Sequence, residues 1–233
     1  MQGKGGVNPM EPLLEVKNLT VSYGDEAVLR DVSFTLQEGE ILAVTGSSGI
    51  GKSTLLKSVM GLLGAEGKVL GGDILYLGKS ILHMTQKELT ALRGAQIGMV
   101  FQDCGASLCP VRKVGTQIYE AVRAHERVTK AEVMDRTAAL LGKIGLSDWR
   151  RIWNSYPFQL SGGMNQRVGI CMAMLLSPSL LLADEPTSAL DVTVQKQVGE
   201  ELLLMRREYN TAMLLVTHNP ALAEKMADRV LRL

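Results

Sequence analysis

The chain has few cysteines, almost no excess of charge and no long apolar run. Three cysteines in 233 residues are too few for a disulfide framework and too irregularly spaced for a zinc site, which indicates a reducing compartment. The formal net charge of +1 argues against a general nucleic-acid-binding protein, since such proteins usually have a strong basic excess. With 46% hydrophobic residues, the chain is also not a disordered one.

Signals for a membrane or a secretory pathway are equally scarce. The longest apolar stretches, near residues 170–176 and 180–183, are far shorter than the ~20 residues that a spanning helix needs. Residues 1–10 have no apolar core of the signal-peptide kind, and we interpret them as a flexible leader before one domain at 11–233. We therefore expect a soluble, intracellular protein.

The order of short apolar runs and helical patterns predicts an α/β fold. Strands are expected at 14–16, 32–36, 41–44, 72–77, 96–101, 180–183 and 213–216, and helices at 53–63, 86–92, 162–176, 192–208 and 220–227. Residues 114–145 also have a helical pattern, with a capping box at Thr129 and Glu132 and a stop at Gly145. The alternation in the last third predicts a parallel sheet. The helical block at about 103–176 interrupts it and is best placed as an inserted subdomain.

A complete phosphate-binding loop motif follows the apolar run at 41–44. It consists of Gly46, Ser47, Ser48, Gly49, Ile50, Gly51, Lys52 and Ser53, followed by Thr54. The glycines allow successive N–H groups to point at phosphate oxygens, and the next helix adds its positive dipole end. Lys52 would reach the β- and γ-phosphates of ATP, and the Ser53 hydroxyl would bind Mg²⁺. A chance glycine-rich turn is the alternative, which the strand–loop–helix context disfavours.

A second apolar strand delivers two carboxylates to the same edge of the sheet. Asp184 and Glu185 directly follow the run at 180–183. We expect Asp184 to hold the metal through water and Glu185 to act as the general base on the attacking water. The alternative is an acidic turn before Pro186.

The stretch Leu160-Ser161-Gly162-Gly163-Met164-Asn165-Gln166 resembles the LSGGQ-type signature of ATP-binding cassette (ABC) ATPases. The resemblance covers almost the whole chain and implies a mostly parallel core sheet, an antiparallel β subdomain and an inserted helical subdomain. From the residues alone, Ser161 is a good N-cap, and Gly162 and Gly163 leave first-turn N–H groups open to an anion. A second anion site on one domain makes sense if each copy completes a partner's site. A simple loop-to-helix start is the alternative.

The same resemblance implies roles for further residues. Tyr23 matches the aromatic that stacks on adenine, Gln102 the glutamine that senses the metal and the γ-phosphate, and His218 the histidine on the γ-phosphate. Asp191 ends the stretch 188–191, which in the family crosses the dimer. Two cassettes face head to tail, so Ser161, Gly162, Gly163 and Asp191 would act in trans on a second cassette that is either identical or a paralogue.

Within the family, Phe101-Gln102-Asp103 and the segment 106–110 resemble the importer group for oligopeptides, dipeptides and nickel. That resemblance implies permease subunits, an extracytoplasmic solute-binding protein, a peripheral place on the cytoplasmic face of the inner membrane, and a peptide, nickel or metal-chelate solute. Four positions depart from the group's pattern: Cys104, Cys109, Asn165 and Asn219. We interpret the two cysteines as bystander thiols.

Two other functions are left open. A soluble ABC ATPase that acts on nucleic acid or the ribosome usually has two cassettes or a long coiled coil, and this chain has one cassette and no basic block, so no nucleic-acid partner is expected. A degenerate cassette that binds ATP only as a structural switch would lack catalytic residues, whereas this sequence has all of them.

Overall fold

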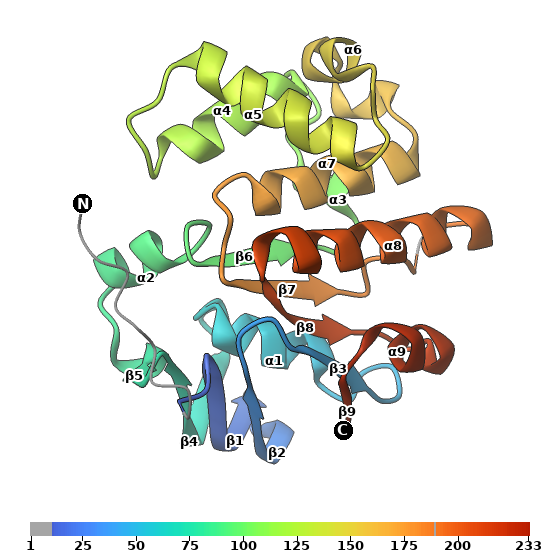
Figure 1. Ribbon diagram of the computed structural model, residues 1–233. Coiled ribbons are helices and arrows are strands. Elements are labelled where there is room, and N and C mark those ends of the chain that lie inside the picture. The colour runs from blue at the N-terminus through green and yellow to red at the C-terminus, as the bar shows by residue number, and fades with distance from the viewer. Residues whose placement is uncertain (1–10, 189) are drawn as a thin grey trace.

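The computed structural model describes residues 11–188 and 190–233. The expected leader, residues 1–10, and Ala189 of the expected dimer-crossing stretch lie outside the described residues. Figure 1 shows a helical layer at the top, a parallel sheet below it, and an antiparallel sheet at the bottom, with α1 between the two sheets. The predicted combination of an antiparallel sheet, a parallel sheet and an inserted set of helices is confirmed.

The antiparallel sheet has the strand order β2-β1-β4-β5. Its strands are β1 (Leu14–Tyr23), β2 (Glu26–Leu36), β4 (Gly67–Tyr76) and β5 (Lys79–Ser80). The first three are longer than the sequence pattern indicated, because register shifts interrupt their alternation of apolar and polar residues. Asn18 and Asp31 adopt a positive φ at these shifts, and the Asn18 side chain donates to Asp31 at 2.7 Å. A 3₁₀ turn (Ile81–His83) and α2 (Gln86–Leu92) follow.

The other sheet is parallel, with the order β6-β7-β8-β3-β9, and confirms the predicted arrangement. Its strands are β3 (Ile41–Thr45), β6 (Ile97–Val100), β7 (Leu180–Asp184), β8 (Ala212–Val216) and β9 (Arg229–Arg232). The edge strand β9 was not predicted, because arginines at both ends leave an apolar stretch of only two residues. It pairs with β3 from Leu42 opposite Arg229 to Thr45 opposite Arg232.

The helix α1 (Lys52–Val59) packs between the two sheets and forms the centre of one core. Leu55, Leu56 and Val59 are fully buried there. We expected this helix to continue to residue 63, which is wrong. Gly61 adopts a left-handed conformation and the Leu62 N–H donates to the Lys57 carbonyl oxygen, an arrangement that ends a helix.

The opposite face of the parallel sheet is covered by α7 (Gly162–Met174), α8 (Val192–Tyr209) and α9 (Pro220–Met226). Side chains along a strand point alternately to its two faces. Accordingly, Leu180 and Leu182 belong to the core around α1, whereas Leu181 and Ala183 belong to the core beneath the helical layer. The continuous apolar run at 180–183 is therefore the pattern of a strand buried on both faces.

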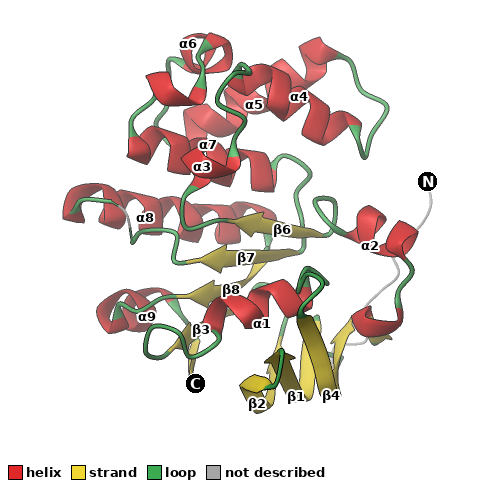
Figure 2. Cartoon of the chain, turned by 180° about the vertical axis from the view of Figure 1, so that it is seen from behind, coloured by secondary structure: helices red, strands yellow, loops and turns green. Residues whose placement is uncertain are grey.

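Between β6 and β7, the chain forms the helical layer at the top of Figure 2. It contains α3 (Cys104–Ser107), α4 (Val114–Arg123), α5 (Lys130–Lys143), α6 (Trp149–Asn154), a 3₁₀ turn (Pro157–Gln159) and α7. The helical pattern at 114–145 corresponds to the two helices α4 and α5, and the predicted capping box at Thr129 and Glu132 starts the second. Of the helices in the described residues, none combines the length and the hydrophobicity required to cross a membrane.

Candidate active site

The loop between β3 and α1 wraps tightly against the antiparallel sheet. Gly49 and Gly51 have φ values of 83° and 103°, which side chains other than glycine rarely adopt. A Cβ on Gly51 would lie 2.9 Å from the carbonyl oxygen of Val28, so only glycine fits here. Gly51 caps α1 without a side-chain hydrogen bond, so the first N–H groups of the helix have no side-chain partner at the cap and are available to a ligand.

One hollow of about 260 Å³ brings together eight of the predicted site residues. It is lined by Val28, Ser48, Gly49, Gly51, Lys52, Ser53, Thr54, Gln102 and Glu185. These residues come from four segments that are far apart in the sequence. Val28, on β2, was not predicted, because a single valine in a strand gives no sequence signal for a binding site.

Lys52 is only 6% exposed, and the loop surrounds its ammonium group. Its Nζ donates to the carbonyl oxygens of Gly46 and Ser47, at 2.9 Å each. It also lies 4.0 Å from the Glu185 carboxylate. A buried cation of this kind needs such partners, and it supplies the main positive charge of the hollow.

Ser53, in the first turn of α1, contacts Asp184, the last residue of β7. The Ser53 hydroxyl donates to the Asp184 carboxylate at 3.0 Å, although the residues are 131 positions apart. Burial raises the pKa of Asp184, and the hydrogen bond from Ser53 opposes that rise. A hydroxyl and a carboxylate are oxygen ligands of the type that Mg²⁺ prefers. The donor set therefore fits the expected metal.

Glu185 and His218 also contact each other. The carboxylate lies 2.8 Å from His218 Nδ1, and the Glu185 N–H donates to the Val216 carbonyl oxygen at 2.9 Å. Glu185 has a φ of 44°, a strained conformation for a residue with a side chain. The turn thereby aims the carboxylate back over the loop, between Lys52 and His218.

Some predicted residues lie outside the hollow that holds Lys52. His218 lines a neighbouring hollow with Gly46 and Ser47. Tyr23 ends β1, and its ring lies 3.1 Å from where a Cβ on Gly67 would stand. Ile50, at the tip of the loop, is exposed.

The signature turn lies apart from these groups, at the start of α7. The Ser161 hydroxyl accepts a hydrogen bond from the Met164 N–H at 3.3 Å, which caps the helix. Apart from its chain neighbours and the backbone of its own helix, no atom of the described residues lies within 4 Å of a Cβ built on Gly162. Ser161, Gly162 and Gly163 are not among the residues that line the hollow around Lys52.

Asp191 lies beside the signature turn, through a contact that the sequence does not reveal. Its carboxylate caps α8 by accepting from the N–H groups of Thr193 and Val194, at 3.1 and 3.0 Å. A Cβ on Gly163 would stand 2.9 Å from the Val194 side chain. The four residues expected to act in trans therefore lie on two helix starts that pack against each other.

A buried ion pair also links α7 and α8. The Arg167 guanidinium lies 2.6 Å from the Glu201 carboxylate and also donates to the Ile144 carbonyl oxygen. Burial raises the pKa of Glu201, and the hydrogen bond and charge of Arg167 oppose that rise. The start of α7 is thus held firmly to its neighbours, although its first residues face outward.

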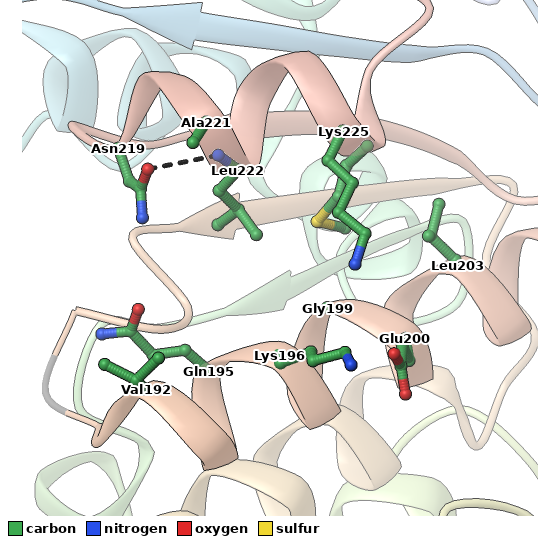
Figure 3. Close-up of a pocket in the computed structure, with 11 residues that line it drawn as sticks. Val192, Gln195, Lys196, Gly199, Glu200, Leu203, Asn219, Ala221, Leu222 and Lys225 are labelled. Atoms are coloured by element: carbon green, nitrogen blue, oxygen red, sulfur yellow. Dashed lines mark hydrogen bonds between the residues drawn. The ribbon is translucent and has the colours of Figure 1, made fainter.

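Two of the four departures from the importer pattern, Cys104 and Asn219, lie in clearly defined surroundings. Burial raises the pKa of the Cys104 thiol to about 11, so this group is protonated at neutral pH. Figure 3 shows Asn219 at the rim of a mostly apolar hollow of about 200 Å³ between α8 and α9. Its side chain accepts from the Leu222 N–H at 3.2 Å and caps α9, which an Asp at this position would also do.

Comparison with known proteins gives one consistent result. The family model described as "ABC transporter" matches residues 29–188. The oligopeptide transport ATP-binding protein OppD of Salmonella typhimurium is 42% identical over 227 residues, 96% of this chain and 68% of the relative. The dipeptide transport ATP-binding protein DppD of Bacillus subtilis is 40% identical over 226 residues, 95% of this chain and 68% of the relative. The alignment with the OppD of Bacillus subtilis includes 62% of that relative's length. The chain thus spans about two thirds of the length of these relatives.

Solved structures agree with this assignment. A dimeric ATP-binding cassette in a post-hydrolysis state, bound to ADP and Pi, aligns with a TM-score of 0.81 and 29% identity over 94% of both chains. The cbiO1 protein of Clostridium perfringens, part of the transporter complex cbiONQ, aligns with a TM-score of 0.81 and 28% identity, over 95% of this chain and 84% of that one.

Proposed function

Because this chain belongs to the ABC transporter family, we propose that it is the ATP-hydrolysing subunit of an importer for oligopeptides or dipeptides. The observation that carries this proposal is the hollow in which Lys52, Ser53 and Glu185 converge from separate strand ends. The names of the relatives at 40–42% identity support the peptide solute over nickel or a metal chelate.

ATP binds through the loop 46–54. The open N–H groups and Lys52 hold the phosphates, Tyr23 stacks on the adenine, and Val28 packs against the nucleotide. Lys52 then exchanges its contacts with the Gly46 and Ser47 carbonyl oxygens for phosphate oxygens. Lys52 Nζ lies 4.0 Å from the Glu185 carboxylate. A phosphate chain bound to Lys52 would therefore lie beside Glu185, the proposed general base.

Mg²⁺ would be held by Ser53 directly and by Asp184 through water, with Gln102, which lines the same hollow as Ser53, as a third group for the metal. The chemistry supplied by the bound ion is neutralisation of charge on the β- and γ-phosphate oxygens. With the ion bound, the Ser53 hydroxyl oxygen would serve as a ligand, and the Asp184 carboxylate, no longer bonded to Ser53, would hold water.

Hydrolysis uses Glu185 as the general base. A water attacks the γ-phosphorus in line, its proton passes to the Glu185 carboxylate, and the bond to the β–γ bridging oxygen breaks. His218, 2.8 Å from Glu185, fixes the direction of that carboxylate and contacts the γ-phosphate. Lys52 stabilises the charge that develops on the leaving ADP.

A second cassette completes the site. Ser161, Gly162 and Gly163 of the partner would close over the γ-phosphate, and Asp191 would line the same junction. The outward-facing start of α7 and the open space around Gly162 support this arrangement. The partner is either a second copy or a paralogous cassette, and ATP binding would hold the two together.

Permease subunits would bind where the segment after β6 meets the helical layer, the inserted unit at about 103–176. The side chains of Phe101 and Phe158 are 44% and 72% exposed. Gln166 donates to the Phe101 carbonyl oxygen, and Asn165 donates to the carbonyl oxygen of Pro157, beside Phe158. Exposed aromatic residues of this kind often mark protein interfaces. The subunit would thus lie peripherally on the cytoplasmic face of the membrane, with an extracytoplasmic solute-binding protein on the other side.

Reconstitution of the complete transporter in proteoliposomes tests the proposal. We expect ATP-dependent uptake of short peptides, and peptide-loaded binding protein should stimulate phosphate release. Lys52→Ala should abolish both activities. Stimulation by nickel or a nickel chelate with no response to peptides would overturn the assignment of the solute, and absence of phosphate release would overturn the ATPase.

A further inference from the structure

The side chain of Gln166 connects two motifs that are distant in the sequence. Gln166 is 3% exposed and lies in the second turn of α7. Its Nε2 donates to the Phe101 carbonyl oxygen at 3.0 Å, and its Oε1 accepts from the Cys104 N–H at 3.4 Å. The two backbone groups lie on either side of Gln102, so one side-chain amide holds the whole segment.

The Cys104 thiol also donates to the Phe101 carbonyl oxygen, at 3.4 Å, but Gln166 is the side chain that joins both backbone groups to α7. Buried backbone groups that lose their partner are costly, so the segment 101–104 is expected to move away from α7 if Gln166 is removed. Gln102 is the residue of this segment that lines the hollow around Lys52. Ser161, five positions before Gln166, caps the same helix.

We propose that Gln166 is a positioning residue that couples Gln102 to the signature turn, so that the two halves of the composite ATP site move together. The coupling rests on the proposed function, because it concerns how Gln102 and Ser161 reach one nucleotide. When Gln102 moves toward the γ-phosphate, the bonded segment pulls on α7 and sets the direction in which Ser161 faces the partner cassette.

The neighbouring residue Asn165 provides a matched control. It lies in the same part of α7, is 8% exposed and also has a side-chain amide. Its Nδ2 donates to the carbonyl oxygens of Pro157 and Leu160, at 3.0 and 3.5 Å, and not to the segment around Gln102. Substitution of Asn165 therefore disturbs α7 without releasing Gln102.

A double-mutant cycle in the assembled transporter tests the coupling. Gln166→Met keeps the length of the side chain and removes both bonds, and we expect kcat for ATP to fall about tenfold with little change in KM. In a Gln102→Ala background the same substitution should change kcat less than about twofold, because there is no Gln102 side chain left to position. Asn165→Ala should have the same fold-effect in both backgrounds.

Equal fold-losses for Gln166→Met in both backgrounds, or no loss in either, would overturn the coupling and leave the ATPase intact. If the wild-type transporter releases no phosphate, the proposed function itself fails, so the two failures are distinguishable. Thermal melting of each variant checks that the fold is retained.

Gln166→Glu provides a second variant with the same shape. Its carboxylate would face the Phe101 carbonyl oxygen, whereas its protonated form can donate to that oxygen and accept from Cys104 as the amide does. The charged groups nearby are Asp103, which caps α3, and Arg167, which pairs with Glu201. We expect its kcat relative to wild type to rise as the pH falls from 8 to about 6, since burial favours the neutral acid. A ratio that is constant with pH would contradict the coupling.

Discussion

The phosphate loop and the signature turn are both glycine-rich helix starts, and they differ in how much of their surroundings this chain supplies. The loop is enclosed by Val28 from β2 and by Asp184 and Glu185 from the end of β7. Among the described residues, the contacts of Ser161 to Gly163 are mainly their own helix cap and the Val194 side chain. A helix start that binds an anion in isolation would need further donors, so the second site is incomplete within one chain.

The distribution of charge follows the same division. Lys52 and Glu185 lie 4.0 Å from each other in the hollow. The nearby Asp184 carboxylate is partly buried, which raises its pKa. The nearest buried ion pair of the signature region, between Arg167 and Glu201, lies behind the helix start and faces the neighbouring helices. We therefore expect the first region to serve the chemistry and the second to serve docking.

The largest effect is expected for Glu185→Gln. Removal of the general base should lower turnover by about 10²–10⁴-fold while ATP still binds. Closed dimers should then accumulate with ATP, which size-exclusion chromatography with radiolabelled nucleotide can detect. Glu200→Gln on the surface of α8 is the control and should turn over normally. Normal turnover in Glu185→Gln would remove that residue from its proposed role.

Gly162→Glu separates docking from nucleotide binding. Since nothing in the described residues lies within 4 Å of a Cβ there, the chain itself can accommodate the side chain. Affinity of the isolated chain for ATP should be unchanged, and turnover of the assembled transporter should fall about 10²-fold because the partner's phosphates are repelled. Gly142→Glu, at another open helix position, is the control. Weaker ATP binding by the isolated Gly162→Glu chain would show that the turn acts within its own molecule.

Gly169→Ala tests how tightly the middle of α7 is packed compared with its start. A Cβ on Gly169 would clash with the Cys104 sulfur, so we expect a loss of about 1–3 kcal/mol of unfolding free energy. Gly142→Ala is open on all sides and should instead gain about 0.5–1 kcal/mol. Chemical denaturation measures both. Equal stability of the two variants would mean that α3 and α7 do not pack closely.

The smallest effect concerns Asp184→Asn in the nucleotide-free protein. Burial raises the pKa of Asp184, so its ionisation costs more in the folded than in the unfolded state. This cost is absent below the unfolded-state pKa, grows as the pH rises through the folded-state pKa, and is fully present at neutral pH. Asp184→Asn should thus raise the free energy of unfolding at pH 7 and not at pH 3, while Mg²⁺-dependent turnover is lost. Destabilisation at pH 7 would contradict this account.

Some elements of the fold can be predicted from short sequence patterns and others cannot. The apolar run at 180–183, the capping box at Thr129 and the loop at 46–53 were all recognised, because each signal is local and complete within a few residues. Strand β9 and the full length of β1 and β2 were missed. Their signals are short, or broken by bulges such as that at Asn18, and they become strands only because a partner strand lies alongside.

The sequence by itself determined which residue types are available for phosphate, metal and base chemistry, because glycine spacing and an acidic pair at a strand end are local properties. Only the tertiary structure decided which of them meet. It joined Ser53 to Asp184, turned Glu185 toward His218, brought Val28 to the loop and attached Gln166 to both sides of Gln102. These contacts span up to 131 positions of the chain, and they depend on the order of parallel strands in the sheet, which no short segment encodes.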